Sequence, residues 1–230
     1  RPTVLILSLS NNLPIGIMHK QLLSGLEKNA EVRMIKNRTA FFQHLHASPR
    51  PQAVIVADAA ICEEPRHADL APKLLEYARS GGRVALGVQF CYFLETDCTV
   101  SFFRLWGVPW SLAMHPVEKT FALNPDGIPT PLSSAALLPA FTANVLIVHA
   151  RPCDDAVYSR VDPCEPGDQD QGLPYDISVG VGAAAWARIG QGFLGYVGDV
   201  HGEQAFARLT IEMCGVTIGP GDLGARDIFR

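Results

Sequence analysis

Gln89 and Cys91 are the first residues whose types and positions could do chemistry. They stand in a short turn that follows an apolar, β-favouring segment within Arg83–Glu95, RVALGVQFCYFLE. In an open α/β sheet, ligands bind where strands end and helices begin, and we expect this stretch to be such a crossing. A cysteine nucleophile needs a base or a positive neighbour to lower its pKa from about 8.5. No nearby residue supplies one, so a hydrolase using Cys91 would need a distant histidine; the alternative is a buried structural cysteine.

A nucleophile elbow is not predicted at this turn. In such an elbow the reactive residue occupies a strained position between small neighbours. The position two residues after Gly87 holds Gln89, whose amide is not a nucleophile. Bulky Phe90 and Tyr92 flank Cys91, which argues against a tight turn around the thiol.

The string GDVHG at 198–202 resembles the G-D-x-H-G motif of metal-dependent phosphoesterases, whose Asp and His bind a dinuclear metal. The other parts of that ligand set, an early Asp-x-His and a later G-N-H-[DE], are missing from the sequence, and a metal site needs its full set. We therefore predict neither a metal nor a cofactor. We expect Asp199 to cap the helix that follows and His201 to line a pocket at the same sheet edge.

Other polar candidates are scattered along the chain. His115, in the segment MHPVE, has a spacing close to the H-x-E of some acid–base pairs, although a lone loop histidine is more often solvated or structural. His149 and Asp58 each end an apolar strand. His115, His149, Asp199 and His201 could share one polar site at the strand ends, but no local pattern shows that they converge.

The segment 1–90 alternates between apolar runs typical of buried strands and stretches of helical periodicity. This alternation predicts right-handed βαβ crossovers and a doubly wound, mainly parallel sheet of the α/β class. The expected strands are Thr3–Ser8, Val32–Ile35, Ala53–Ala57 and the segment from Arg83, and the expected helices are Ile15–Lys28, Ala40–Ala47 and Leu70–Arg79.

The second half of the chain predicts further strands and one long loop. Short strands are expected around Met114–Phe121, and Pro152–Pro174, rich in Asp, Pro, Gly and Gln, is expected to be a surface loop. The other expected elements are helices at Cys98–Trp106 and Gly202–Cys214 and strands at Val145–His149, Ile177–Arg188 and Gly195–Val200, the last two joined by a glycine-rich turn.

Size and composition limit the class of protein. The chain has 230 residues, 48% hydrophobic and 18% charged, with a net charge of −4. We expect a single domain over residues 1–230, no nucleic-acid partner and no membrane span, since no apolar segment reaches about 20 residues. The six cysteines are scattered, and we expect them to be free thiols in a reducing cytoplasm. A Cys153–Cys164 disulfide is left open. A leader removed before Arg1 is also left open.

Three stretches together resemble the ThuA-like (trehalose-utilisation) group of the class I glutamine amidotransferase-like superfamily. They are YARSGGRVALGVQF, FFRLWGVPWSLAMHPVEKTFALNPDGIPTPL and AAAWARIGQGFLGYVGDVHGEQAFARLTIEMCG. His115 falls on the histidine of the family's central pattern, and His201 on that of its closing strand–turn–strand–helix unit.

The resemblance implies a three-layer, flavodoxin-like fold, a pocket at the strand ends and a role with sugars. The amidotransferases of the superfamily have a G-x-C-x-G elbow and an H-x-E pair near the C-terminus. This chain has Gln89 at the cysteine position and no H-x-E after its last strand. Glutamine hydrolysis is therefore not expected.

These observations leave three hypotheses for function. The first is a protein that binds or processes a small polar metabolite, such as a sugar, in a pocket lined by His115, Asp199 and His201 with Gln89 at its floor. The second is a hydrolase that uses Cys91. The third is a non-catalytic interaction protein that has kept the fold without the chemistry. Assembly into a homo-oligomer is left open.

Overall fold

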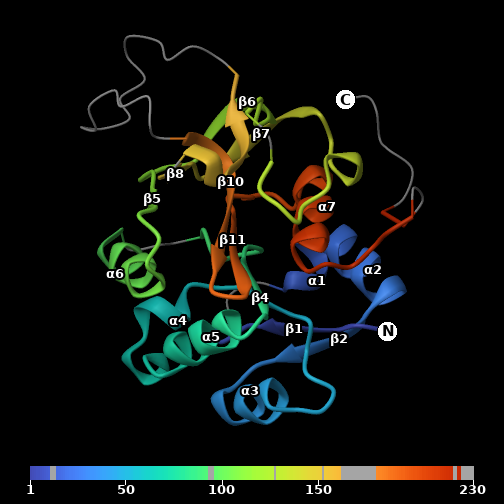
Figure 1. Cartoon of the computed structure of the whole chain (residues 1–230), viewed down its shortest axis with the longest axis vertical. Helices are drawn as coiled ribbons and strands as arrows, with labels where there is room; N and C mark the ends of the chain where they lie inside the picture. The colour runs from blue at the N-terminus through green and yellow to red at the C-terminus, as the bar shows by residue number, and fades with distance from the viewer. Residues whose placement is uncertain are drawn as a thin grey trace.

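The fold is built on one mixed sheet that joins a parallel half to an antiparallel half (Figure 1). The computed structural model describes residues 1–10, 14–92, 96–126, 128–151, 153–161, 180–219 and 222–223. In this part of the chain the strand order is β2-β1-β3-β4-β11-β10-β9-β6-β7, with β8 pairing with β10 and β5 pairing with β8.

The parallel half is the predicted doubly wound sheet. All its neighbouring strands run in the same direction, in the order β2-β1-β3-β4-β11. Most of these strands have short, mainly apolar sequences, which suit strands that are covered on both faces, whereas the edge strand β2 (EVRMI) has exposed Glu31, Arg33 and Met34. These strands are β1 (Thr3–Leu7), β2 (Glu31–Ile35), β3 (Ala53–Val56), β4 (Arg83–Leu86) and β11 (Gly192–Val197).

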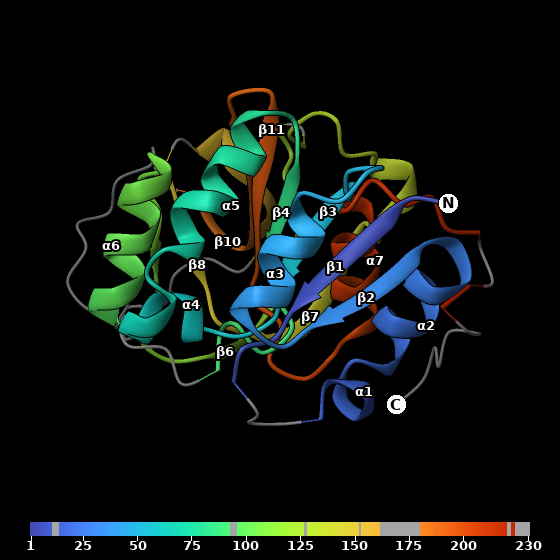
Figure 2. The ribbon, with the colours of Figure 1, turned by 90° about the horizontal axis from the view of Figure 1, so that it is seen from below.

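Helices cover both faces of the parallel half (Figure 2). Side chains alternate along each strand, so Leu5 of β1 packs into the core beneath one helical layer and Val4 into the core beneath the other. The first layer contains α3 (Arg38–Leu45), α4 (Ala60–Glu63), α5 (Leu70–Arg79) and α6 (Thr96–Trp106). The second layer contains α1 (Ile15–Met18), α2 (Lys20–Asn29) and α7 (Gln204–Met213).

The antiparallel half extends the sheet beyond β11. A tight turn at Gly190, where φ is +61°, joins β10 to β11. A Cβ atom at this position would lie 2.8 Å from the carbonyl oxygen of Arg79, so glycine suits both the backbone and the space. The strands are β5 (Ser111–Leu112), β6 (Val117–Leu123), β7 (Ala140–Val145), β8 (Val148–Ala150), β9 (Ala156–Arg160) and β10 (Gly180–Ile189), and the 3₁₀ helices of the described chain are Pro65–His67, Ser134–Ala136 and Cys153–Asp155.

Most of the predicted elements are confirmed, with three corrections. The predicted helix Ile15–Lys28 is broken at His19, whose φ of −111° and ψ of 36° are not helical. The predicted strand Val145–His149 is two strands, because β7 ends at Val145 and β8 begins at Val148. Between them, the backbone N–H of Leu146 bonds the carbonyl of Gly198 instead of a ladder partner.

The third correction concerns the long loop predicted at Pro152–Pro174. Its first part contains β9, which pairs with β10 and β6 and so belongs to the sheet. Residues 162–174, and with them the Cys153–Cys164 bridge, lie outside the described residues. The same holds for 93–95 at the end of the Arg83–Glu95 stretch and for 177–179 at the start of the predicted strand Ile177–Arg188.

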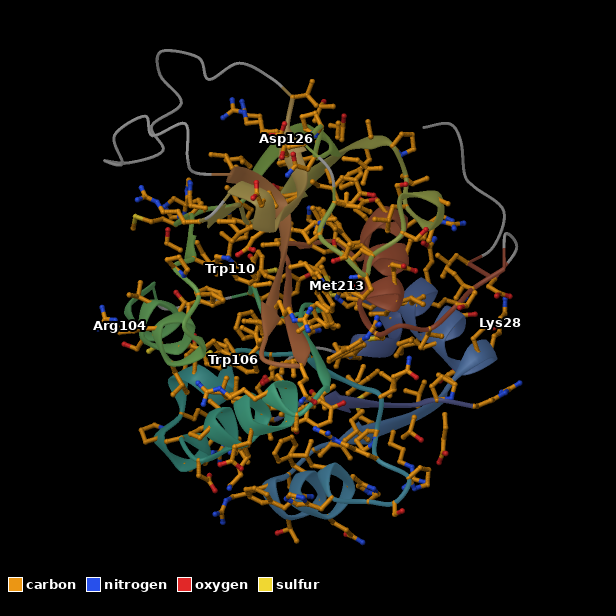
Figure 3. All side chains as sticks on the ribbon, in the orientation of Figure 1. Lys28, Arg104, Trp106, Trp110, Asp126 and Met213 are labelled. Carbon is orange, nitrogen blue, oxygen red and sulfur yellow. The ribbon has the colours of Figure 1, made fainter. Side chains whose placement is uncertain are left out.

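The three tryptophans belong to the core. Trp106, Trp110 and Trp186 are each no more than 3% exposed. In Figure 3, Trp106 of α6 points toward the sheet, whereas Arg104 of the same helix points outward. The indole N–H of Trp110 donates to the Oδ2 atom of Asp155 at 2.9 Å.

Candidate functional site

Two neighbouring parallel strands, β4 and β11, end side by side at the same edge of the sheet. Each continues into a segment that sequence reasoning singled out: the turn from Gly87 to Tyr92 and the loop from Gly198 to Gly202. In open α/β sheets this edge is where ligands bind. The strand end predicted as a ligand-binding position is thus present at this edge of the sheet.

The turn after β4 contains a strained residue, and that residue is Val88 rather than Gln89. Val88 has φ +61°, a left-handed conformation that is unfavourable for a β-branched side chain. The strained position of an elbow is therefore occupied by a valine, which has no reactive group. The backbone N–H of Gln89 donates to the carbonyl of Ala57 at 2.9 Å, and this anchors the turn to the end of β3.

Cys91 is buried and hydrogen-bonded, as expected of a structural cysteine. Its side chain is 4% exposed, and its Sγ donates to the carbonyl oxygen of Asp199 at 2.9 Å. Burial, together with the nearby Asp199 charge, raises the pKa of the Cys91 thiol far above its ordinary value. The thiolate that nucleophilic attack requires is disfavoured here, so the site gives no support to a Cys91 hydrolase.

The first residue of α7 is Gln204 and its N-cap residue is Glu203, so Asp199 does not cap this helix as the sequence predicted. Asp199 instead holds the loop that precedes α7. Its Oδ1 accepts hydrogen bonds from the backbone N–H groups of His201 (3.0 Å), Gly202 (2.9 Å) and Glu203 (3.2 Å). The side chain is 4% exposed. Burial raises the pKa of Asp199 to about 6, against the opposing effect of these three hydrogen bonds.

His19 is a buried residue beside this site that the sequence did not indicate. It occupies the junction between α1 and α2, is 3% exposed, and places its Nδ1 atom 3.8 Å from the Oδ2 atom of Asp199. Burial lowers the pKa of His19 to about 4, so the imidazole is neutral at pH 7. The sequence around His19 is typical of an amphipathic helix and does not mark His19 as a site residue. The one local signal is that a polar side chain, His19, interrupts the apolar stripe of that helix.

A cleft of about 340 Å³ opens where the turn after β4 and the loop after β11 meet. Its polar lining includes Tyr92, Asn144 and His201. Asn144 and His201 are in contact, with 3.4 Å between the Nδ2 atom of Asn144 and the Nε2 atom of His201. The Tyr92 hydroxyl donates to the carbonyl of Val200. The apolar part of the described lining is formed by Leu112, Ala113, Met114, Pro116, Leu146 and Val200.

The structure brings together some of the predicted site residues and leaves others apart. Cys91 and His201 line the cleft, while Asp199 lies behind it and holds the loop. Gln89, which we expected at the pocket floor, is 5% exposed and is not among the described lining residues. His115 is exposed and is not among them either, although its neighbours Met114 and Pro116 are.

The remaining strand-end candidates have local roles. Asp58 accepts from the backbone N–H groups of Leu9 (2.7 Å) and Ser10 (3.1 Å), so it fastens the end of β1 to the end of β3. His149 is 8% exposed and lies in β8, paired with β10 and β5. Neither residue is among those that line the cleft in the described part of the chain.

Metal-binding clusters and membrane spans are both missing from the described residues. Among them, no group of three or more His, Cys, Asp and Glu side chains could hold a metal ion. None of the helices they form is both long enough and apolar enough to cross a membrane.

Sequence comparison gives no relative for this chain: no protein-family model matches it, and no curated protein matches. Solved structures do match. A cytoplasmic protein from Salmonella typhimurium has a TM-score of 0.57 at 12% identity, over 95% of this chain and 100% of its own. A putative ThuA-like protein from Bacteroides uniformis has a TM-score of 0.55 at 12% identity, over 92% and 89% respectively.

A β-galactosidase from Bacillus circulans sp. alkalophilus is also similar, with a TM-score of 0.54 at 13% identity. The match covers 94% of this chain but only 32% of the enzyme, so the chain spans about a third of its length. At these identities the likeness concerns the fold. The chain has the flavodoxin-like α/β fold of ThuA-like proteins, which the resemblance in its sequence implied.

Proposed function

We propose that this protein binds a small, polar, uncharged ligand such as a sugar in the cleft at the carboxyl ends of β4 and β11. The observation that carries the proposal is the pairing of His201 with Asn144 beside Tyr92 at the carboxyl edge of the parallel sheet. An imidazole, an amide and a phenol ring can hydrogen-bond hydroxyl groups and cover the apolar face of a sugar ring. A volume of about 340 Å³ is within the range of small-ligand sites.

The proposal differs from the sequence hypothesis in the residues that contact the ligand. His201 is still proposed to contact the ligand, and Asn144 and Tyr92 are added as contacts. Asp199 is proposed to hold the backbone of the His201 loop and not to contact the ligand. His115 and Gln89 have no assigned role in binding, because neither is among the described lining residues. Binding is the part of the hypothesis that the cleft supports.

The test is sugar binding by wild-type protein and by two cleft variants. Saturation-transfer NMR and calorimetry with D-galactose, D-glucose and trehalose should detect at least one of them. Galactose is included because a β-galactosidase shares the fold. His201→Ala and Asn144→Ala should each weaken the affinity by about fivefold or more, the effect of losing one hydrogen bond.

The matched control is His46→Ala. His46 is an exposed histidine that follows α3, and it is not among the described lining residues. This variant should bind the same sugars with wild-type affinity. Unchanged affinity in His201→Ala would overturn the assignment of the cleft, and the absence of binding by any of the three sugars would overturn the sugar class.

We also propose a cytoplasmic location. Support comes from Cys62, Cys91 and Cys214, which are free thiols, as is usual in a reducing compartment. The similar Salmonella protein is likewise described as cytoplasmic. Fractionation of cells expressing the tagged chain, with a periplasmic marker as comparison, would test this.

A further inference from the structure

The loop that carries His201 is held from behind the cleft by one carboxylate. Oδ1 of Asp199 accepts from three successive backbone N–H groups, at residues 201, 202 and 203. These bonds set the path of the backbone on either side of His201. The position of the His201 ring in the cleft therefore depends on the position of the Asp199 side chain.

The same loop is seated on the junction between α1 and α2. Gly202 has φ +77°, and a Cβ atom there would overlap the carbonyl oxygen of Met18. This close approach brings the loop against the residue at which the predicted single helix is broken, His19. His19 is buried at this break.

Oδ2, the second oxygen of Asp199, faces His19. The Nδ1(His19)–Oδ2(Asp199) distance of 3.8 Å is too long for a hydrogen bond but is a close polar contact. Nε2 of His19 is buried and has no hydrogen-bond partner among the described residues. A void of about 10 Å³ borders both side chains. This is about the size of one water molecule, so the pair is no ligand site.

The other ionisable groups around Asp199 do not replace this contact. The Cys91 thiol bonds the backbone carbonyl of Asp199, and the Tyr92 hydroxyl bonds the carbonyl of Val200. Glu203 is exposed, and its negative charge repels that of Asp199. His19 is thus the polar side chain that contacts the second carboxylate oxygen in the described part of the chain.

We infer that His19 is a positioning residue for His201: from the α1–α2 junction it orients Asp199, which fixes the loop that places His201 in the cleft. This arrangement couples the first helices to a loop near the end of the chain. The inference uses the proposed function only where ligand affinity is concerned, since the placement of His201 can be measured in the free protein.

The first experiment measures the reactivity of His201 toward diethyl pyrocarbonate at pH 7, by peptide mass spectrometry. His115, exposed and outside the described cleft lining, is the internal reference. His19→Leu fills the space without a polar atom, and His19→Asn restores a polar group near the Nδ1 position. We expect His201 in His19→Leu to react about fivefold faster, as for one lost polar contact, and His19→Asn to match wild type.

Equal His201 reactivity in His19→Leu and wild type would mean that His19 only fills space, and would overturn the inference. Should His19→Leu fail to unfold cooperatively in urea, His19→Met takes its place, because its flexible side chain adapts to irregular spaces. His46→Ala is the control for loss of a histidine elsewhere and should leave His201 reactivity unchanged.

The second experiment measures D-galactose affinity in the same variants. His19→Leu should weaken it by about fivefold, and His19→Asn should restore it. If wild type binds no galactose while His201 reactivity still responds to His19→Leu, the ligand class is wrong and the positioning role stands. If galactose binds with equal affinity in His19→Leu and wild type, the positioning role is overturned and the cleft assignment stands.

Discussion

The hydroxyl of Tyr92 donates a hydrogen bond to the backbone carbonyl of Val200, a residue 108 positions further along the chain. Next to it, the Cys91 thiol donates to the carbonyl of Asp199 at 2.9 Å. Consecutive residues of the turn after β4 thereby bond consecutive residues of the loop after β11. These two parts of the cleft lining form one hydrogen-bonded unit.

Tyr92→Phe should weaken sugar binding as well as stability. The substitution removes one hydroxyl and leaves the Val200 carbonyl without that donor, at a cost of about 1 kcal/mol in the free energy of unfolding. Since the bond holds the loop of His201, affinity for the sugar that wild type binds should fall as well. Urea unfolding and calorimetry measure the two effects.

Tyr77→Phe is the matched control for that variant. The Tyr77 hydroxyl donates to the carbonyl of Pro51 at 2.8 Å and is buried, but it lies at the amino end of the strands, where β3 begins. We expect a similar loss of stability with wild-type affinity. A loss of affinity equal to that of Tyr92→Phe would show that binding follows global stability and not the cleft.

Asp199 and His19 make opposite contributions to the pH dependence of stability. Burial raises the pKa of Asp199 from 3.8 to about 6 and lowers that of His19 from 6.5 to about 4. Between about pH 4 and 6.5 the folded protein therefore binds more protons at Asp199, and fewer at His19, than the unfolded chain does. Acidification through this window stabilises the fold through Asp199 and destabilises it through His19, so the two contributions largely cancel.

Single substitutions should expose each contribution. Relative to wild type, His19→Asn should gain about 2 kcal/mol of unfolding free energy between pH 7 and pH 5, and Asp199→Asn should lose about 1 kcal/mol. Urea unfolding at the two pH values gives both differences. Parallel pH profiles for His19→Asn and wild type would contradict the burial-shifted pKa of His19.

Gly202→Ala should destabilise the protein by about 1–3 kcal/mol, because alanine is strained at positive φ and its Cβ would overlap the Met18 carbonyl oxygen. Gly16→Ala is the control. Gly16 lies in α1, and a Cβ atom added there would have nothing within 4 Å, so alanine should be neutral or stabilising by up to about 1 kcal/mol. Equal free energies of unfolding for the two variants would contradict the close contact between the loop at Gly202 and the Met18 carbonyl.

Cys91 should resist alkylation in the folded protein. Burial raises its pKa, as it does for the fully buried Cys214, so both thiols should react with iodoacetamide at pH 7 only after unfolding in urea. The half-buried Cys98 should react faster than either. Peptide mapping gives the three rates, and a Cys91 rate above that of free glutathione would revive the hydrolase hypothesis.

The parallel half of the fold was predictable because its signals are local. The run Ala53–Val56 is apolar throughout, since helices cover both faces of its sheet, and Leu70–Arg79 has a periodic apolar stripe with a glycine stop. The antiparallel half was less predictable. β9 follows a segment rich in Asp and Pro, and its strand character depends on partners in β10 and β6.

The candidate site was predicted in part. His201 and Asp199 followed from a strand end that precedes a helix, and the structure places them in one loop. Asn144 and Tyr92 were not identified as site residues, because their contacts with His201 and Val200 join segments far apart in the sequence. His115 fitted a family pattern, yet it lies outside the described cleft lining.

The sequence by itself determined the α/β class, the strands and most of the helices of the parallel half, and the edge of the sheet where polar side chains collect, because apolar periodicity and turn residues act over a few positions. Only the tertiary structure decided that Val88 takes the strained position, that His19 leaves its helix to face Asp199, and that the cleft is lined by His201 and Asn144. These features depend on packing between segments that no local pattern relates.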